Sequence, residues 1–77
     1  MANVKVYSTP TCPWCTRAKN YLKSNNVQFE DIDVSTDREK AMEMVKKSGQ
    51  QGVPVIEIDG QIIIGFDQNK IDNLLGL

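Results

Sequence analysis

Two apolar runs near the end of the chain place the tightest limit on its fold. VPVIEI (53–58) and QIIIGF (61–66) are separated only by Asp59-Gly60, a dipeptide that favours a two-residue hairpin turn with positive φ. We therefore predict two antiparallel strands. The second run contains three consecutive isoleucines, so apolar cover is expected on both of its faces. This predicts helices on both sides of one sheet.

The first half of the chain predicts a strand, a helix and a second strand. VKVY (4–7) alternates β-branched with other residues and leads into a run of turn formers. From Pro13 an amphipathic helix is predicted to run to about 24–26, because apolar residues recur at spacings of three and four: Trp14, Ala18, Tyr21 and Leu22. VQFEDIDV (27–34) then indicates a second strand, parallel to the first through a right-handed crossover.

Capping signals predict two further helices. Thr36 and Glu39 fit a capping box, in which the Thr36 hydroxyl accepts a hydrogen bond from the Glu39 amide. Gly49 suits the left-handed residue that ends this helix, whose predicted inward stripe is Ala41, Met44, Val45 and Ser48. Asp67 begins the last helix, with Phe66 and Ile71 as a hydrophobic staple. The residues expected to face inward there are Ile71, Leu74 and Leu75.

The predicted order is therefore β-α-β-α-β-β-α, an α/β fold in a single domain over 1–77. The net charge of −1 provides no basic surface for nucleic acid. There is neither a leader-like N-terminus nor an apolar run approaching the ~20 residues of a membrane span. We expect a cytoplasmic protein, a monomer with neither nucleic acid nor membrane as partner.

The two cysteines, Cys12 and Cys15, lie where the first loop becomes the first helix. Free amides and the helix dipole stabilise a thiolate at such a position. Pro13 suits the first helical residue, because its ring presets φ and its missing N–H would have had no partner in the helix. Cys15 then lies close enough to attack a mixed disulfide on Cys12. The spacing predicts a two-step dithiol cycle.

Other interpretations of the pair remain open at this point. A disulfide between Cys12 and Cys15 would close too small a loop to stabilise the fold much. Zinc normally takes four N or S ligands, and the chain has two thiols and no histidine, so zinc or a shared iron–sulfur cluster would require a second copy or an outside ligand. The cysteines could also be simply packed. Trp14 fits either an aromatic wall beside the thiol or ordinary helix packing.

Three motifs together resemble the glutaredoxin family, and the resemblance covers essentially the whole chain. They are Thr11-Cys12-Pro13-Trp14-Cys15 after the first strand, Val53-Pro54 before the third, and Gly65-Phe66-Asp67 before the last helix. The resemblance implies the minimal thioredoxin-like fold, with a four-stranded mixed sheet of order 2-1-3-4 flanked by three helices. It also implies a thiol-disulfide oxidoreductase that reduces disulfide-containing or glutathionylated proteins, with glutathione as reductant and no metal.

The resemblance further implies roles for individual residues. Val53 would pair its backbone with an extended thiol substrate, and Pro54 would be a cis-proline facing the cysteines. Asp67 would contact the γ-glutamyl end of glutathione. The other implied substrate or glutathione contacts are Thr11, Pro13, Trp14, Gln50, Gly65 and Phe66.

The chain departs from the family pattern at three positions near this site. Thr9 replaces a lysine that usually stands three residues before the nucleophile. Gln50 stands at a basic or amide position, and Ile64-Gly65 replaces a Gly-Gly pair. The alternative within the same class is a hydrogen donor for ribonucleotide reductase that thioredoxin reductase reduces. A metal or iron–sulfur protein is the alternative from another class.

Overall fold

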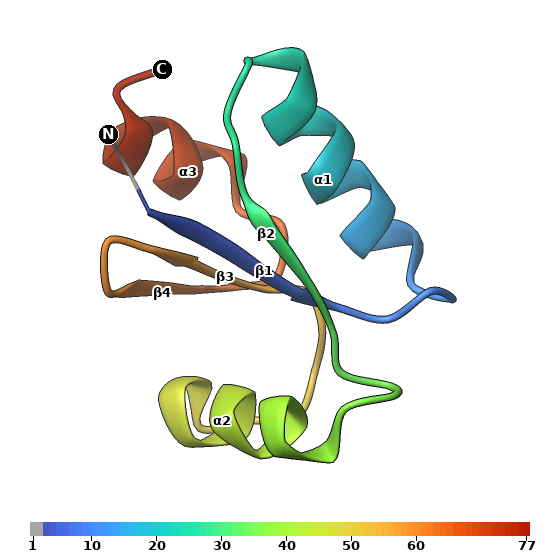
Figure 1. The fold of residues 1–77 in the computed structure, drawn as a ribbon. Coiled ribbons are helices and arrows are strands. Elements are labelled where there is room, and N and C mark those ends of the chain that lie inside the picture. The colour runs from blue at the N-terminus through green and yellow to red at the C-terminus, as the bar shows by residue number, and fades with distance from the viewer. Residues whose placement is uncertain (1–2) are drawn as a thin grey trace.

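The computed structural model describes residues 3–77, and they form one four-stranded sheet with three helices (Figure 1). The predicted element order is confirmed. The elements are β1 (Val4–Ser8), α1 (Pro13–Ser24), β2 (Glu30–Asp33), α2 (Arg38–Ser48), β3 (Val55–Ile58), β4 (Gln61–Ile64) and α3 (Gln68–Leu75).

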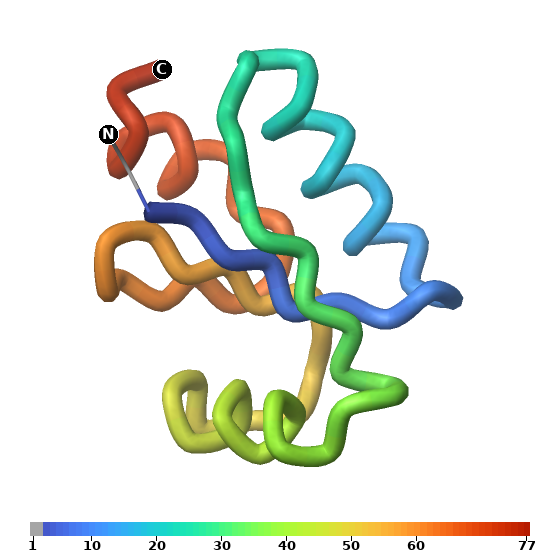
Figure 2. Tube along the Cα trace, viewed as in Figure 1, coloured from blue at the N-terminus to red at the C-terminus, as the bar shows by residue number. Residues whose placement is uncertain are grey.

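The sheet has the predicted order β2-β1-β3-β4. β1 and β2 are parallel, whereas β1 pairs antiparallel with β3 and β3 antiparallel with β4. Helices α1 and α3 lie on one side of the sheet and α2 on the other (Figure 1). The chain trace returns from α2 to the central strand β3 through residues 49–54, which brings this loop to the same end of the sheet as the start of α1 (Figure 2).

The hairpin forms as predicted, with positive φ at both turn residues: Asp59 at 49° and Gly60 at 86°. Ile62 packs with the residues under α2, and Ile63 is buried with those under α1 and α3, so β4 has apolar cover on both faces. Ile64 departs from that expectation, because its side chain is 56% exposed. It is the last residue of β4, an edge strand of the sheet.

The larger apolar core lies between the sheet and the α1/α3 pair. It contains eight buried side chains from strands and helices: Val4, Val6, Ala18, Leu22, Ile56, Ile58, Ile63 and Ile71. Phe66 packs against this cluster, as a staple residue would. The prediction that Leu74 faces inward is wrong, since it is 40% exposed. Helix α3 is short, and one turn through Ile71 is enough to cover its part of the sheet.

On the other side of the sheet, Tyr7, Ile32, Met44 and Val55 form a smaller buried cluster beneath α2. The capping box predicted at Thr36 is wrong: Asp37 is the N-cap, and its carboxylate accepts a hydrogen bond from the Lys40 amide at 3.1 Å. Both residue types cap well, and the backbone places the more strongly preferred Asp at the helix start. Gly49 ends α2 with φ 75°, as predicted.

Strand β2 is shorter than the predicted 27–34. Only Glu30–Asp33 pair with β1, while Val27 and Phe29 pack on the larger core without joining the sheet. β2 is an edge strand, and three of its four residues are acidic. Within residues 3–77 there is no helix with the length and apolar content to cross a bilayer.

Candidate active site

The two cysteines lie at the N-terminus of α1. Cys12 is the N-cap residue, in extended conformation with φ −96° and ψ 110°, and Pro13 opens the helix. The Cys15 backbone N–H donates a hydrogen bond to Cys12 Sγ over 3.2 Å. The sulfur therefore takes the place of the oxygen that caps most helices, where an N–H group and the helix dipole both favour negative charge.

Two further loops meet Cys12. The Cys12 thiol lies 3.7 Å from the Val53 carbonyl oxygen, to which it donates, and the Val53–Pro54 peptide is cis, as the resemblance implied. Pro54 is buried, and its carbonyl accepts from the Gly65 amide at 2.8 Å. The α1 N-terminus, the turn before β3 and the end of β4 therefore form one site.

The two thiols have different surroundings. Both are free; Cys12 is partly exposed, whereas Cys15 is fully buried. Burial raises the pKa of Cys15 from its ordinary value of 9.0 to about 11, and its hydrogen bond with Cys12 adds to this rise. The Thr9 backbone N–H, which lies at the Cys15 sulfur, lowers this pKa and so offsets part of the rise. At neutral pH Cys15 is a protonated thiol, so the residue able to act first on an incoming disulfide is Cys12.

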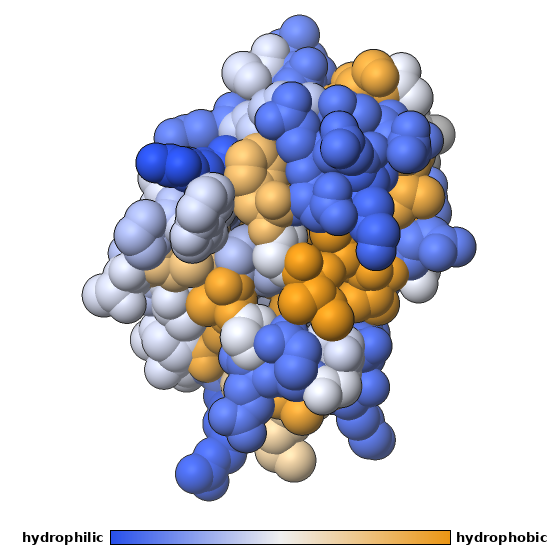
Figure 3. All heavy atoms as spheres, turned by 180° about the vertical axis from the view of Figure 1, so that it is seen from behind, coloured by the Kyte–Doolittle hydropathy of each residue, from blue (hydrophilic) through white to orange (hydrophobic). Residues whose placement is uncertain are grey.

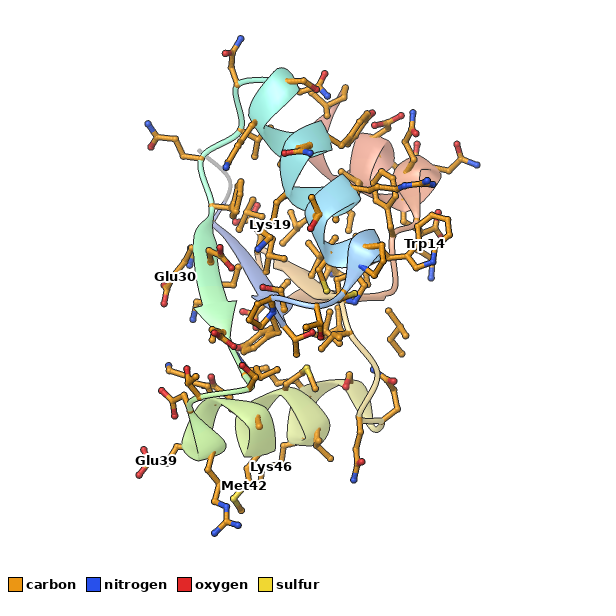
Figure 4. All side chains as sticks on the ribbon, turned by 90° about the vertical axis from the view of Figure 1, so that its right-hand side faces the viewer. Trp14, Lys19, Glu30, Glu39, Met42 and Lys46 are labelled. Carbon is orange, nitrogen blue, oxygen red and sulfur yellow. The ribbon has the colours of Figure 1, made fainter. Side chains whose placement is uncertain are left out.

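Trp14 points away from the core at the start of α1 (Figure 4). Its side chain is 55% exposed, and the Arg17 guanidinium lies over its ring at 4.8 Å from the centroid. The packing interpretation of Trp14, and its place in the inward stripe of α1, are therefore wrong. Thr11 and Pro13 are exposed beside it. Together these residues present an accessible surface next to the partly exposed thiol.

Three other residues predicted to contact the substrate, Gln50, Phe66 and Asp67, interact with groups of the protein itself. Gln50 folds back onto its own loop: its Oε1 accepts from the Gly52 amide at 2.5 Å, and its Nε2 donates to the Gly52 carbonyl at 3.0 Å. Phe66 packs against Tyr21, with ring centroids 5.6 Å apart. Asp67 is the N-cap of α3, as predicted, and accepts from the Lys70 amide at 3.2 Å.

The sequence analysis did not single out Ser8, Lys19 or Asp31, which form a polar cluster close to Cys15. Lys19 Nζ lies 3.2 Å from the Asp31 carboxylate and 3.4 Å from Ser8 Oγ, and Ser8 Oγ donates to Asp31 at 3.0 Å. The available signal was the position of Lys19, four residues after Cys15 and thus on the same face of the helix. Within the part of the chain that is described, no group of three or more His, Cys, Asp or Glu side chains is placed to hold a metal ion.

Apolar surface is also visible on the face opposite to that of Figure 1, surrounded by polar side chains (Figure 3). The large apolar side chains exposed on the molecule include Trp14 and Ile64. Trp14 is two residues after Cys12 in the sequence, and Ile64 adjoins Gly65, whose amide binds the Pro54 carbonyl.

Known proteins resemble the chain in sequence and in fold. The family model for glutaredoxin matches residues 4–63. A glutaredoxin-like 8.6 kDa protein of Clostridium pasteurianum is 54% identical over 72 residues, covering 94% of this chain and 96% of its own. Glutaredoxin 3 of Escherichia coli is 46% identical over 67 residues, covering 87% and 81%. The crystal structure of a mutant thioredoxin-like protein superimposes with a TM-score of 0.91 at 34% identity, covering 99% of this chain and 97% of that one.

The family match, these relatives and the Cys12–Cys15 pair on a helix N-terminus identify a thiol-disulfide oxidoreductase. The sequence match covers well over half of the chain. The chain therefore belongs to the glutaredoxin family.

Proposed function

We propose that the protein reduces protein disulfides and glutathione mixed disulfides by a dithiol cycle in which Cys12 attacks and Cys15 resolves. The observation that carries this proposal is the asymmetry of the pair. Cys12 is partly exposed on a helix N-terminus, and Cys15 is buried directly behind it with its N–H on the Cys12 sulfur. Such an arrangement makes one thiolate reactive and leaves the second thiol available for the resolving step.

In the first step, the Cys12 thiolate attacks one sulfur of the substrate disulfide. A bond forms between Cys12 and that sulfur, and the other substrate sulfur leaves as a thiolate. In the second step, Cys15 attacks Cys12 Sγ and releases the bound half as a thiol. The protein ends as the Cys12–Cys15 disulfide, and the substrate has gained two electrons and two protons.

The Val53 backbone supports an orientation for the substrate. Its carbonyl faces the Cys12 thiol, and its N–H has no hydrogen-bond partner among residues 3–77. An extended substrate segment can pair with this free amide as a short added strand, which would align its sulfur with Cys12. Trp14 and Ile64 would contact the flanks of that segment.

Serine variants test the order of attack. Cys12→Ser is expected to abolish reduction of every disulfide. Cys15→Ser is expected to retain reduction of glutathione mixed disulfides and to lose most activity on protein disulfides, because only those require a resolving thiol. Assays with a glutathionylated peptide and with an intramolecular protein disulfide measure the two activities. Equal losses in both variants on the glutathionylated peptide would contradict the assignment.

Glutathione as reductant is supported by membership of the family and by Asp67, whose carboxylate lies beside the first amides of α3. We propose that Asp67 binds the α-amino group of the γ-glutamyl residue. Asp67→Asn retains a capping oxygen but loses the charge, so KM for glutathione mixed disulfides is expected to rise several-fold while the melting temperature changes little. An unchanged KM combined with lower stability would make Asp67 a cap alone.

A second candidate is a hydrogen donor for ribonucleotide reductase that is reduced by thioredoxin reductase. It is favoured by Thr9, which carries no charge, and by Gln50, whose amide is already bound within its own loop. Both features leave fewer groups for the glutathione carboxylates. Reduction of the oxidised protein by glutathione with glutathione reductase, compared with thioredoxin reductase, separates the two candidates.

We also propose a cellular location and partners for the protein. A free dithiol suits the reducing cytoplasm, and we place the protein there as a monomer. Disulfide-containing and glutathionylated proteins are the proposed partners, with neither nucleic acid nor membrane surface among them. The metal or iron–sulfur alternative would give colour or bound metal in protein purified without oxygen.

A further inference from the structure

A polar cluster lies behind the cysteine pair, where α1 crosses the ends of β1 and β2, and its Asp31 side chain is 51% exposed. Lys19 on α1 forms an ion pair with Asp31 on β2 at 3.2 Å, and both contact the hydroxyl of Ser8 on β1. Ser8 is buried, and the Lys19 side chain is only 21% exposed. A lysine would extend into water if it served only to solvate the helix surface, so its inward placement calls for a reason.

The cluster adjoins the buried thiol by two routes. Lys19 follows Cys15 by four residues, which places the two side chains one helical turn apart on the same face of α1. Ser8 precedes Thr9, whose backbone N–H lies at the Cys15 sulfur. Figure 4 shows Lys19 between α1 and β2. The ammonium group is therefore a fixed positive charge close to a thiol that water does not reach.

We propose that Lys19 is a positioning residue for the resolving step. It stabilises the negative charge that develops on Cys15 as Cys15 attacks the Cys12 mixed disulfide. Asp31 partly neutralises the lysine charge and so limits this stabilisation. This rests on the dithiol cycle proposed above. In the step, the bond between Cys12 and the substrate sulfur breaks and a Cys12–Cys15 bond forms. The Cys15 proton passes to the departing thiolate, so charge and electrons balance without an outside reactant.

The physical reason is the cost of ionising Cys15. Burial disfavours its thiolate, so the pKa of the free dithiol is high, and Lys19 acts in the opposite direction. The charge and polar groups facing Cys15 are few: the Cys12 sulfur and Lys19 on α1, and the Thr9 amide in the loop. Behind Lys19 lie Asp31 and, more distantly, Asp33 on β2. Lys19 is the cation among these groups, and it keeps this role when Cys12 is in a mixed disulfide.

A two-phase exchange reaction tests the proposal. Reduced protein is mixed with an equimolar amount of 5,5′-dithiobis(2-nitrobenzoate). The first phase of thionitrobenzoate release reports the attack of Cys12, and the second reports the attack of Cys15. The rate of each phase is followed from pH 5 to pH 10. Lys19→Met is expected to slow the second phase about three- to tenfold at neutral pH and to move its pH midpoint upward by up to about one unit.

Matched variants separate charge from packing. Lys19→Arg retains the charge and is expected to keep the wild-type pH profile. Lys23→Met removes a lysine one turn further along α1, where the side chain is exposed, and is expected to change neither phase. Asp31→Asn frees the Lys19 charge and is expected to move the second-phase midpoint downward.

Two results would overturn the proposal. One is a second-phase pH profile for Lys19→Met that coincides with that of Lys23→Met. The other is an upward midpoint shift in Asp31→Asn, since that would show that the cluster matters only for packing. A wild-type protein that shows no second phase at all would instead overturn the dithiol cycle itself, so the two failures are distinguishable.

Discussion

The two sides of the sheet are held together by different means. Between the sheet and α1/α3, eight buried side chains form an apolar core. Beneath α2 only four are buried, and Tyr7 is one of them. The α2 side adds a polar network, in which the Tyr7 hydroxyl donates to Glu43 at 3.1 Å and Lys47 donates to Glu57 at 2.7 Å.

The difference shows how a small chain divides its limited apolar content. The larger core supports α1, the helix whose N-terminus carries both cysteines, so the catalytic geometry depends on the better-packed side. The network under α2 supplies contacts that apolar packing there does not. We expect the two sides to respond differently to loss of apolar volume, to alkali and to loss of a single hydroxyl group.

The largest effect is expected from Leu22→Ala on the α1 side. Leu22 is fully buried in the larger core, and leucine-to-alanine changes at such sites cost about 2–5 kcal/mol. For a domain of this size that loss is a large share of the total stability, and disulfide reductase activity should fall with the folded fraction. Urea denaturation measures it. The exposed neighbour Lys23→Ala is the control, and a comparable loss in that variant would contradict the prediction.

Met44→Ala makes the same test on the α2 side. Met44 is buried, but its cluster is smaller and its helix has solvent on its outer face, so we expect a cost of about 2 kcal/mol. Reduction of a small disulfide should persist in the folded protein, because the cysteines lie on the opposite side. Denaturation and activity measured on the same samples check both points. A loss larger than that of Leu22→Ala would reverse the ranking of the two sides.

Alkali should weaken the α1 side through Cys15. Its folded-state pKa of about 11 lies above the ordinary 9.0, so folding favours the protonated thiol. The associated stability is fully present below pH 9 and is lost as the pH rises through about 11, by up to about 2 kcal/mol. The free energy of unfolding is compared with that of Cys15→Ala across this range.

The comparison with Cys15→Ala also separates Cys15 from other groups that lose protons in alkali. Burial raises the pKa of Tyr7, and the hydrogen bond to Glu57 raises that of Lys47, so both groups also destabilise the fold as they lose protons in alkali. Both are present in the variant, and their contributions cancel in the difference. If the wild type and Cys15→Ala lose stability in parallel above pH 9, the alkaline sensitivity does not come from Cys15.

The smallest effect is expected from Tyr7→Phe. This change removes the hydroxyl that donates to Glu43 and accepts from Lys47, but keeps the ring in the cluster and leaves the Lys47–Glu57 pair intact. We expect a loss of about 1 kcal/mol, the usual net value of such hydrogen bonds. Thermal denaturation beside Tyr21→Phe gives a matched comparison, since Tyr21 bonds Asp72 on the α1 side. An unchanged stability would show that the network under α2 contributes nothing through Tyr7.

Much of the fold could be predicted from local signals. The Asp59-Gly60 turn, the glycine that ends α2 and the aspartate that caps α3 each act within a few residues of themselves. What the sequence left unsettled was competition between neighbours and the reach of helices. Thr36 and Asp37 can both cap α2, and the exposure of Ile64 depends on how far α2 extends over the sheet.

The candidate site likewise contains residues that could be predicted from the sequence and residues that could not. Cys12 and Cys15 were predictable because their spacing on a helix start carries the chemistry. The role of Lys19 was not predictable, because its contact with Asp31 depends on the parallel strand register. That register pairs Val6 with Asp31 and so brings the Asp31 carboxylate to α1. Gln50 bonds to Gly52 within its own loop, an arrangement that side-chain type alone does not reveal.

The short acidic edge strand has a consequence for concentrated solutions of this protein. An open sheet edge offers unpaired backbone groups to any similar strand, and small proteins with such edges tend to assemble into larger particles. In β2 the carboxylates of Glu30 and Asp33 stand along that edge, so two copies approaching edge to edge bring like charges together. Salt at high concentration screens this repulsion and leaves the edge open to pairing. Light scattering should therefore increase first in buffers of high ionic strength.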